Sequence, residues 1–169
     1  MNSKQIVAVV GAISLLIILV YPAISTGSIA IVIRSSKTEN ADHIYVTVGN
    51  VRAHRVGQVS TEGWNLISNQ SQTIDLVALA GSSIVLAKGQ LPVSRFDMVR
   101  VDLSNTTWVY NKASSRLQLE LSTTSVNIEF TVVAGKESTV TLLLTGHEED
   151  VQGVKFFRPQ ISGTAPLPS

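Results

Sequence analysis

The chain of 169 residues contains no cysteine and little charge. The absence of thiols excludes disulfide bonds, cysteine nucleophiles, iron–sulfur clusters and thiolate zinc sites. Only 15% of the residues are Asp, Glu, Lys or Arg, and the formal net charge is +1. A nearly neutral chain lacks the basic surface that nucleic acids and anionic lipid headgroups attract, so we expect no nucleic-acid partner.

Sequence motifs of common enzyme classes are also missing. The chain has no Gly-x-Ser-x-Gly nucleophile elbow, no phosphate-binding loop and no dinucleotide fingerprint. We therefore expect a protein that is not an enzyme, with no catalytic residues, no cofactor and no metal. At 44% hydrophobic residues the chain is nevertheless too apolar to be disordered, and its length suits one domain with its own core.

The apolar excess is concentrated at the beginning of the chain. Lys4 is followed by an apolar run over Ile6–Val20, and small residues follow up to Ser25. This order predicts a signal peptide over residues 1–25. The alternative is an uncleaved membrane anchor, because the stretch Ile6–Ile24 approaches the ~20 residues that span a bilayer as a helix. Both interpretations place the N-terminus inside and the remaining chain outside, in the extracellular space or at the cell surface.

After the leader, the hydrophobic pattern changes to the two-residue repeat of β-strands. Apolar residues alternate with Asn, Glu and Thr over Val126–Val133, and three leucines alternate with polar residues over Arg116–Ser122. Similar β-branched runs recur along the chain with turn signals between them, and none has a sustained helical period. The pattern predicts an all-β fold, an antiparallel β-sandwich of about 8–10 strands over residues 26–162, followed by a flexible tail over 163–169.

Two histidines and three aspartates are the residues most suited to acid–base or metal chemistry. They are His43, His54, Asp75, Asp97 and Asp102. In a continuous strand His43 and His54 would point to opposite faces, unless a bulge at Gly49 intervened. We interpret both histidines as solvent-facing polar residues. An enzyme would need at least two of the five side chains to converge in one pocket.

A further polar cluster, His147–Asp150, contains three consecutive carboxylates. Carboxylate oxygens are ligands for Ca²⁺, but no EF-hand pattern surrounds these residues. We expect a solvated acidic loop between two strands.

Three aromatic residues and two sequons are candidate contact sites on an exported domain. If the domain binds carbohydrate, Trp64, Trp108 and Tyr110 are expected to be exposed and to stack on sugar rings. The alternative for Trp64 is an aromatic side chain in the core or on a sheet face. The triplets that begin at Asn69 and Asn105 match the acceptor pattern for N-linked glycosylation, although such triplets also arise by chance in a chain rich in Ser and Thr.

Several of the predicted strands also resemble those of a known family. The segments are GSIAIVI, IYVTVGNVRAHR, GWNLI, TIDLVAL, LPVSRFDMVRVDL, FTVVAGKESTVTLLL and FRPQIS, in this order between residues 27 and 162. In them the chain resembles an uncharacterised group of exported prokaryotic proteins, the domain-of-unknown-function family 4382. The resemblance implies an exported β-sandwich, often anchored by a lipid or a helix, and implies no activity. Because the chain has no cysteine, a lipoprotein anchor is excluded here.

These observations predict a non-enzymatic, exported β-sandwich module with a binding or structural role at the cell surface. Its candidate strand-exchange segment is the apolar run after the leader, Ser28, Ile29, Ala30, Ile31, Val32 and Ile33. Such a segment could add to a sheet edge of a neighbouring subunit and so build a homo-oligomer or a filament. The first alternative is a carbohydrate-binding module that uses exposed aromatics, and the second is an enzyme whose site the sequence does not reveal.

Overall fold

The computed structural model describes residues 25–36, 41–119 and 121–166. The leader predicted from the sequence lies outside these residues except for its last one. Within the three described ranges, no helix is long and apolar enough to cross a membrane.

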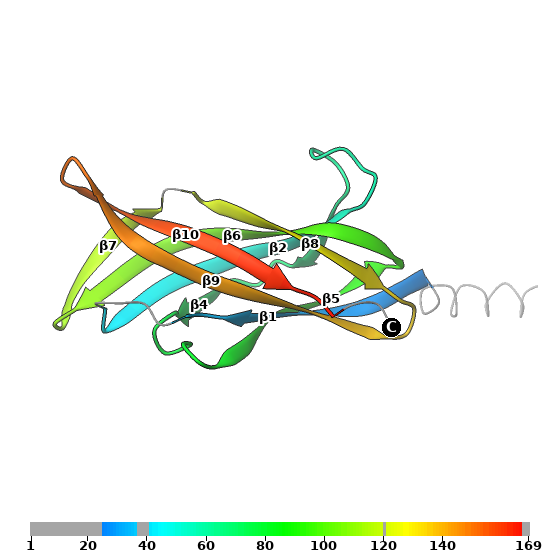
Figure 1. The fold of residues 1–169 in the computed structure, drawn as a ribbon, viewed down its shortest axis with the longest axis horizontal. Coiled ribbons are helices and arrows are strands. Elements are labelled where there is room, and N and C mark those ends of the chain that lie inside the picture. Colours follow the sequence, from blue (N-terminus) through cyan, green and yellow to red (C-terminus); the bar gives the residue numbers. More distant parts are fainter. Residues whose placement is uncertain (1–24, 37–40, 120, 167–169) are drawn as a thin grey trace, which may run out of the picture.

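Ten β-strands make up most of the described chain (Figure 1). They are β1 (Thr26–Arg34), β2 (His43–Arg55), β3 (Trp64–Ser68), β4 (Gln72–Asp75), β5 (Ser83–Pro92), β6 (Ser94–Tyr110), β7 (Ala113–Leu119), β8 (Thr123–Val132), β9 (Glu137–Val151) and β10 (Val154–Thr164). The all-β prediction is confirmed. The predicted alternation also appears as alternating burial, because Ile44, Val46 and Val48 of β2 are buried and the residues between them are more exposed.

One strand is shorter than the sequence pattern predicts. The apolar run Thr73–Leu79 is expected to form a single strand, but β4 ends at Asp75. The Asp75 carboxylate accepts a hydrogen bond from the backbone N–H of Val77 (3.1 Å), and the N–H of Leu79 donates to the backbone carbonyl of Asp75. These local bonds turn the chain out of the sheet, which is a common role of aspartate.

The strands form one hydrogen-bonded path in the order β3-β2-β6-β7-β10-β9-β1-β5, with β4 also pairing with β2 and β8 with β6. Most pairs are antiparallel, as predicted, but β1–β9 and β7–β10 are parallel. The path bends around the core until its two end strands, β3 and β5, come into contact. The sheet is therefore nearly closed and barrel-like, and the two separate sheets expected of a sandwich are not distinct.

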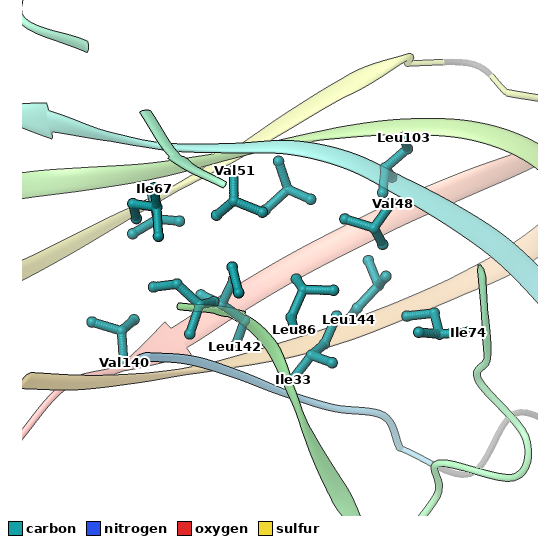
Figure 2. Close-up of a cluster of buried hydrophobic side chains, with 14 of the residues drawn as sticks. Ile33, Val48, Val51, Ile67, Ile74, Leu86, Leu103, Val140, Leu142 and Leu144 are labelled. Carbon is teal, nitrogen blue, oxygen red and sulfur yellow. The ribbon is translucent and has the colours of Figure 1, made fainter. Parts of the chain in front are cut away.

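The core lies between β2, β3 and β6 on one side and β1, β5 and β9 on the other (Figure 2). In Figure 2 the side chains of Val51, Ile67 and Leu103 lie on one side of the core, and those of Val140 and Leu142 lie on the other. All five are buried, and each fully buried aliphatic side chain stabilises the fold by about 1.5–3 kcal/mol. Burial of one face of every long strand explains why the apolar positions alternate in the sequence.

Candidate functional site

β2 carries both candidate histidines, and a bulge places them on the same side of the sheet. Up to Val48 the even-numbered residues face the core, whereas from Val51 onward the odd-numbered residues do. The register with β6 shifts between these two residues, which places a bulge beside Gly49. His43 and His54 therefore both point away from the core, but they lie at opposite ends of the strand and do not converge.

The interpretation of both histidines as solvent-facing holds for His43, which is exposed, but is wrong for His54, which is only 5% exposed. His54 hydrogen-bonds to the β2–β3 loop (residues 56–63), which projects from the sheet in Figure 1. Its Nδ1 lies 2.8 Å from Oδ1 of Asp97 on β6, and its Nε2 lies 3.2 Å from the carbonyl oxygen of Val59 in the loop. Both partners accept hydrogen bonds, so the imidazolium, which donates from both nitrogens, suits this geometry. The hydrogen bond to Asp97 raises the pKa of His54, although burial alone would lower it. The pair thus fastens the loop to β6.

Trp64, the first residue of β3, packs against this histidine. The ring centroids of Trp64 and His54 are 5.0 Å apart, and the indole N–H donates to the carbonyl of Ser60 (2.9 Å). The guanidinium carbon of Arg100 on β6 lies 3.8 Å from the centroid of the Trp64 ring, which is a cation–π contact. The indole therefore contacts both the imidazole of His54 and the guanidinium of Arg100.

The second histidine–aspartate pair lies at the start of β2. Nδ1 of His43 is 2.6 Å from Oδ2 of Asp75, and the imidazole stacks on the ring of Tyr45. Burial would raise the pKa of Asp75, but hydrogen bonds from His43 and from the backbone N–H groups of Ile44 and Val77 outweigh it, so that this pKa is lowered. In the part of the chain that the structure describes, no hydroxyl hydrogen-bonds to either histidine, so neither pair has the nucleophile of a catalytic triad.

Asp102 belongs to a third network, which joins three strands. Its carboxylate accepts hydrogen bonds from Asn50 (2.8 Å) and Arg52 (3.1 Å) of β2 and from Thr123 (3.2 Å) of β8. The five candidate residues thus fall into three separate groups rather than one pocket. Among the described residues there is also no group of three or more His, Asp and Glu that could hold a metal ion. The five candidate residues therefore form two His–Asp pairs and one separate aspartate, and do not converge on a single site.

The acidic run His147–Asp150 is not the loop that the sequence analysis expects. It lies within β9 and pairs with β10. Lys155 of β10 forms an ion pair with Glu148, and Arg158 forms one with Glu149. The prediction was wrong because the acidic side chains of β9 have cationic partners on the following strand, β10. Only the register of the two strands places these opposite charges next to each other.

The three candidate stacking aromatics do not form one platform. Trp108 is only 7% exposed and packs in the core, so the prediction that it is exposed is wrong. The reason is a bulge at Asn105, which has no register partner on β2. Beyond this bulge the even-numbered residues of β6 face the core instead of the odd-numbered ones. Tyr110 is 55% exposed at the end of β6, whereas Trp64 lies beside the opposite end of that strand.

Both sequon asparagines are exposed. Asn105 occupies the β6 bulge with a left-handed φ of +46°, and its Oδ1 accepts a hydrogen bond from Arg116 (2.7 Å). Asn69 follows β3 and lines a groove between β3 and β5. Both side chains are accessible to modification, and their glycosylation stays a prediction.

The end strands β3 and β5 leave the sheet open along the seam between them. A second unpaired edge in the described chain belongs to β8, which pairs only with β6. Their backbones touch where Ile67 meets Gly89, but no backbone hydrogen bond joins the two strands in the described chain. Beside this contact lies a groove of about 530 Å³, lined by residues 67–70, 72 and 85–88. Leu66 on β3 and Val85 on β5 are about half exposed. We call the facing edges of β3 and β5, together with this groove, the open edge.

The segment predicted to be exchanged, Ser28–Ile33, is not at a sheet edge. It lies in β1 between β5, to which it is antiparallel, and β9, to which it is parallel. Ile29, Ile31 and Ile33 are fully buried. Both edges of the segment are paired within its own chain, so it can add to a neighbouring subunit only by leaving this position. Sequence reasoning missed the open edge, because β3 and β5 read as ordinary short strands.

Ten strands around one core, with polar clusters that hold the strands together, define an all-β domain. A family model described as Domain of unknown function (DUF4382) matches residues 26–149, and the chain belongs to this family. The match begins with β1 and extends into β9, and it confirms the resemblance found in the sequence. Comparisons with curated proteins and with solved structures gave no match.

Proposed function

We propose that this chain is a non-catalytic module exported to the cell surface, where it assembles with further copies of itself through the open edge. In this proposal, β3, β2 and β6 form one layer of a sandwich and β9, β1 and β5 form the other, and a partner strand adds at their unsealed seam. The observation that carries it is the contact of β3 with β5 without a backbone hydrogen bond between them.

Unpaired strand edges favour association, because their free N–H and C=O groups are a template for another strand. Leu66 and Val85 add half-exposed apolar side chains to the two edges. On β5, Pro92 has no N–H to donate and Lys88 is charged, and both features discourage pairing at that end. The stretch of β5 best suited to pairing with a partner strand is therefore Ser83–Ala87. Its last three residues, 85–87, line the groove.

The non-catalytic part of the proposal is supported by the use that the fold makes of its acid–base groups. His54 and Asp97 fasten a loop, and His43 and Asp75 join the start of β2 to the end of β4. These contacts explain the four residues without a reaction, since each pair holds together segments that are distant in the sequence.

Export is supported by the apolar run Ile6–Val20 behind Lys4. We expect the native protein in the membrane or culture-medium fraction, and N-terminal sequencing then distinguishes a cleaved leader from a retained anchor. Recovery of the protein in the cytosol would contradict export, whatever the state of assembly.

Assembly is tested by a double substitution at the open edge, Leu66→Lys with Val85→Lys. The matched control is Tyr110→Lys with Val151→Lys, which adds the same charge at residues that are 55% and 44% exposed elsewhere. Sedimentation and electron microscopy of the full chain should show oligomers or filaments for the wild type and the control, and monomers for the open-edge variant. Thermal melting checks that each variant is folded. A monomeric wild type, or equal loss of assembly in both variants, would refute the proposal.

A further inference from the structure

The outer face of β2 and β6 carries two arginines directly opposite each other. Arg52 and Arg100 are register partners in this ladder, so their Cβ atoms are about 5 Å apart on one face of the sheet. Like charges at opposed positions destabilise a sheet, so strand pairing does not explain the pair. Asp102 compensates one of the two, because it accepts a hydrogen bond from Arg52.

The charge of Arg100 has no such compensation. Among the described residues, no hydrogen-bond acceptor or carboxylate contacts its guanidinium, which lies over the ring of Trp64 on β3. The neighbouring side chains of His54 and Arg52 each have a carboxylate partner, which is Asp97 for His54 and Asp102 for Arg52. Arg100 is therefore a cation of this face that an incoming anion can neutralise.

The surroundings of this guanidinium indicate the kind of anion. The contact with the Trp64 ring limits the positions that the Arg100 guanidinium can adopt. A guanidinium binds a carboxylate through two parallel N–H bonds. Trp64 and Met98 add partly exposed apolar surface beside it. The backbone groups of β2 are paired on both sides along this stretch, so a peptide cannot join here as an added strand. An acidic sugar needs only the charged contact and an apolar surface for its ring.

We propose that this outer face binds a carboxylated polysaccharide, with Arg100 pairing to a carboxylate and Trp64 and Met98 bordering the sugar ring. Binding at this face is tested separately from assembly at the open edge, because Arg100 lies on β6 and belongs to neither of the two strands that form that edge. The site also differs from the aromatic platform expected from the sequence, since its main contact is a charge.

The experiment measures the affinity of the full chain for polygalacturonate at low salt, with dextran and polyglutamate as comparison polymers. The variant is Arg100→Gln, and the matched control is Arg95→Gln, which removes the same charge from an exposed residue of the same strand that pairs with Glu129 (3.4 Å). We expect Arg100→Gln to lose about tenfold in affinity, as the loss of a charge-assisted hydrogen bond implies, and Arg95→Gln to lose less than about twofold. Arg100→Lys should lie between them, because it keeps the charge without the flat pair of donors.

Three results would overturn the proposal. They are an absence of binding by the wild type, equal losses in the Arg100 and Arg95 variants, and tighter binding to polyglutamate than to polygalacturonate. The second would indicate a response to net charge alone, and the third an acidic peptide as the partner. If Arg100→Gln does not fold in a thermal melt, Arg100→Lys decides: a several-fold loss supports the site, and an unchanged affinity refutes it.

Discussion

Replacing Gly89 by Ala should force the two ends of the sheet apart. Gly89 on β5 lies against the backbone of Ile67 on β3, and an added Cβ atom would overlap the Ile67 carbonyl oxygen. The same atom would lie 3.1 Å from the carbonyl carbon of Ile67 and 3.2 Å from its Cα, inside the 3.4 Å at which ordinary contact begins. Because all three atoms belong to the backbone, no side-chain rotation relieves the overlap.

The cost of this overlap follows from the movement that it requires. Separating the strands by about 1 Å is overpacking, for which about 1–3 kcal/mol is typical. We expect the free energy of unfolding to fall by about 2 kcal/mol, since β3 is a short end strand that can move in part. The control is Gly49→Ala in β2, where the nearest atom would be at an ordinary 3.7 Å. That variant should be neutral or more stable by about 0.5 kcal/mol, because alanine restricts the unfolded chain.

Urea unfolding followed by far-ultraviolet circular dichroism and tryptophan fluorescence gives both free energies. The expected result is a lower midpoint for Gly89→Ala with an unchanged dependence on urea. If Gly89→Ala proves as stable as Gly49→Ala, β3 does not pack on β5, and the near closure of the sheet is wrong.

Three further substitutions test individual contacts. Phe157→Ala removes a fully buried ring and should lower the free energy of unfolding by about 3–5 kcal/mol in urea titrations, whereas a loss below about 1 kcal/mol would contradict the burial. His54→Gln removes the imidazole that pairs with Asp97. Because folding raises the pKa of His54, the protonated imidazole stabilises the wild type fully at a pH below its ordinary pKa of 6.5. This stabilisation is lost as the pH rises through the raised pKa of the folded state. Thermal melts of His54→Gln and wild type should therefore approach each other at alkaline pH, and a gap that does not change with pH would refute the ion pair. Asp75→Asn should have the opposite pH dependence. Because folding lowers the pKa of Asp75, the ionised carboxylate stabilises the wild type at a pH above its ordinary pKa of 3.8, and this stabilisation is lost as the pH falls through the lowered pKa. The variant should therefore be less stable than the wild type near neutral pH and equally stable in strong acid. In an acid titration followed by circular dichroism, a stability difference that persists at the lowest pH would argue against that interpretation.

The strands could be predicted from the sequence because burial of one face imposes a period of two residues. The alternation over Val126–Val133 corresponds to β8, and that over Arg116–Ser122 overlaps β7. Strand pairing could not be predicted in the same way. β1 and β9 are neighbours from distant parts of the chain, and nothing in either segment indicates a parallel partner. The near closure of the sheet was missed for the same reason.

The candidate sites were harder to predict, because local irregularities decide which way a side chain points. A bulge near Gly49 brings His43 and His54 to one face, and a bulge at Asn105 turns Trp108 into the core. Each bulge adds one residue, so every position beyond it changes face. A glycine in mid-strand is a weak signal for the first bulge, and the asparagine at the second gave no signal that alternation alone could detect.

The contacts between side chains that are distant in the sequence could not be predicted either. Asp97 follows His54 by 43 positions, and only the β2–β6 register brings their side chains together. The cation–π contact of Arg100 with Trp64 likewise depends on the order of three strands. Residue types alone marked these side chains as polar or aromatic, and the sheet topology determined their contacts.

Residue-resolved amide hydrogen exchange tests the open edge most directly. In the monomer we predict slow exchange throughout the interior of β1, which is paired on both sides, and fast exchange at alternate residues of Ser83–Ala87, whose N–H groups point away from β1. On assembly the fast amides should become protected. Uniform protection of β5 in the monomer, or no change in these amides on assembly, would contradict the account.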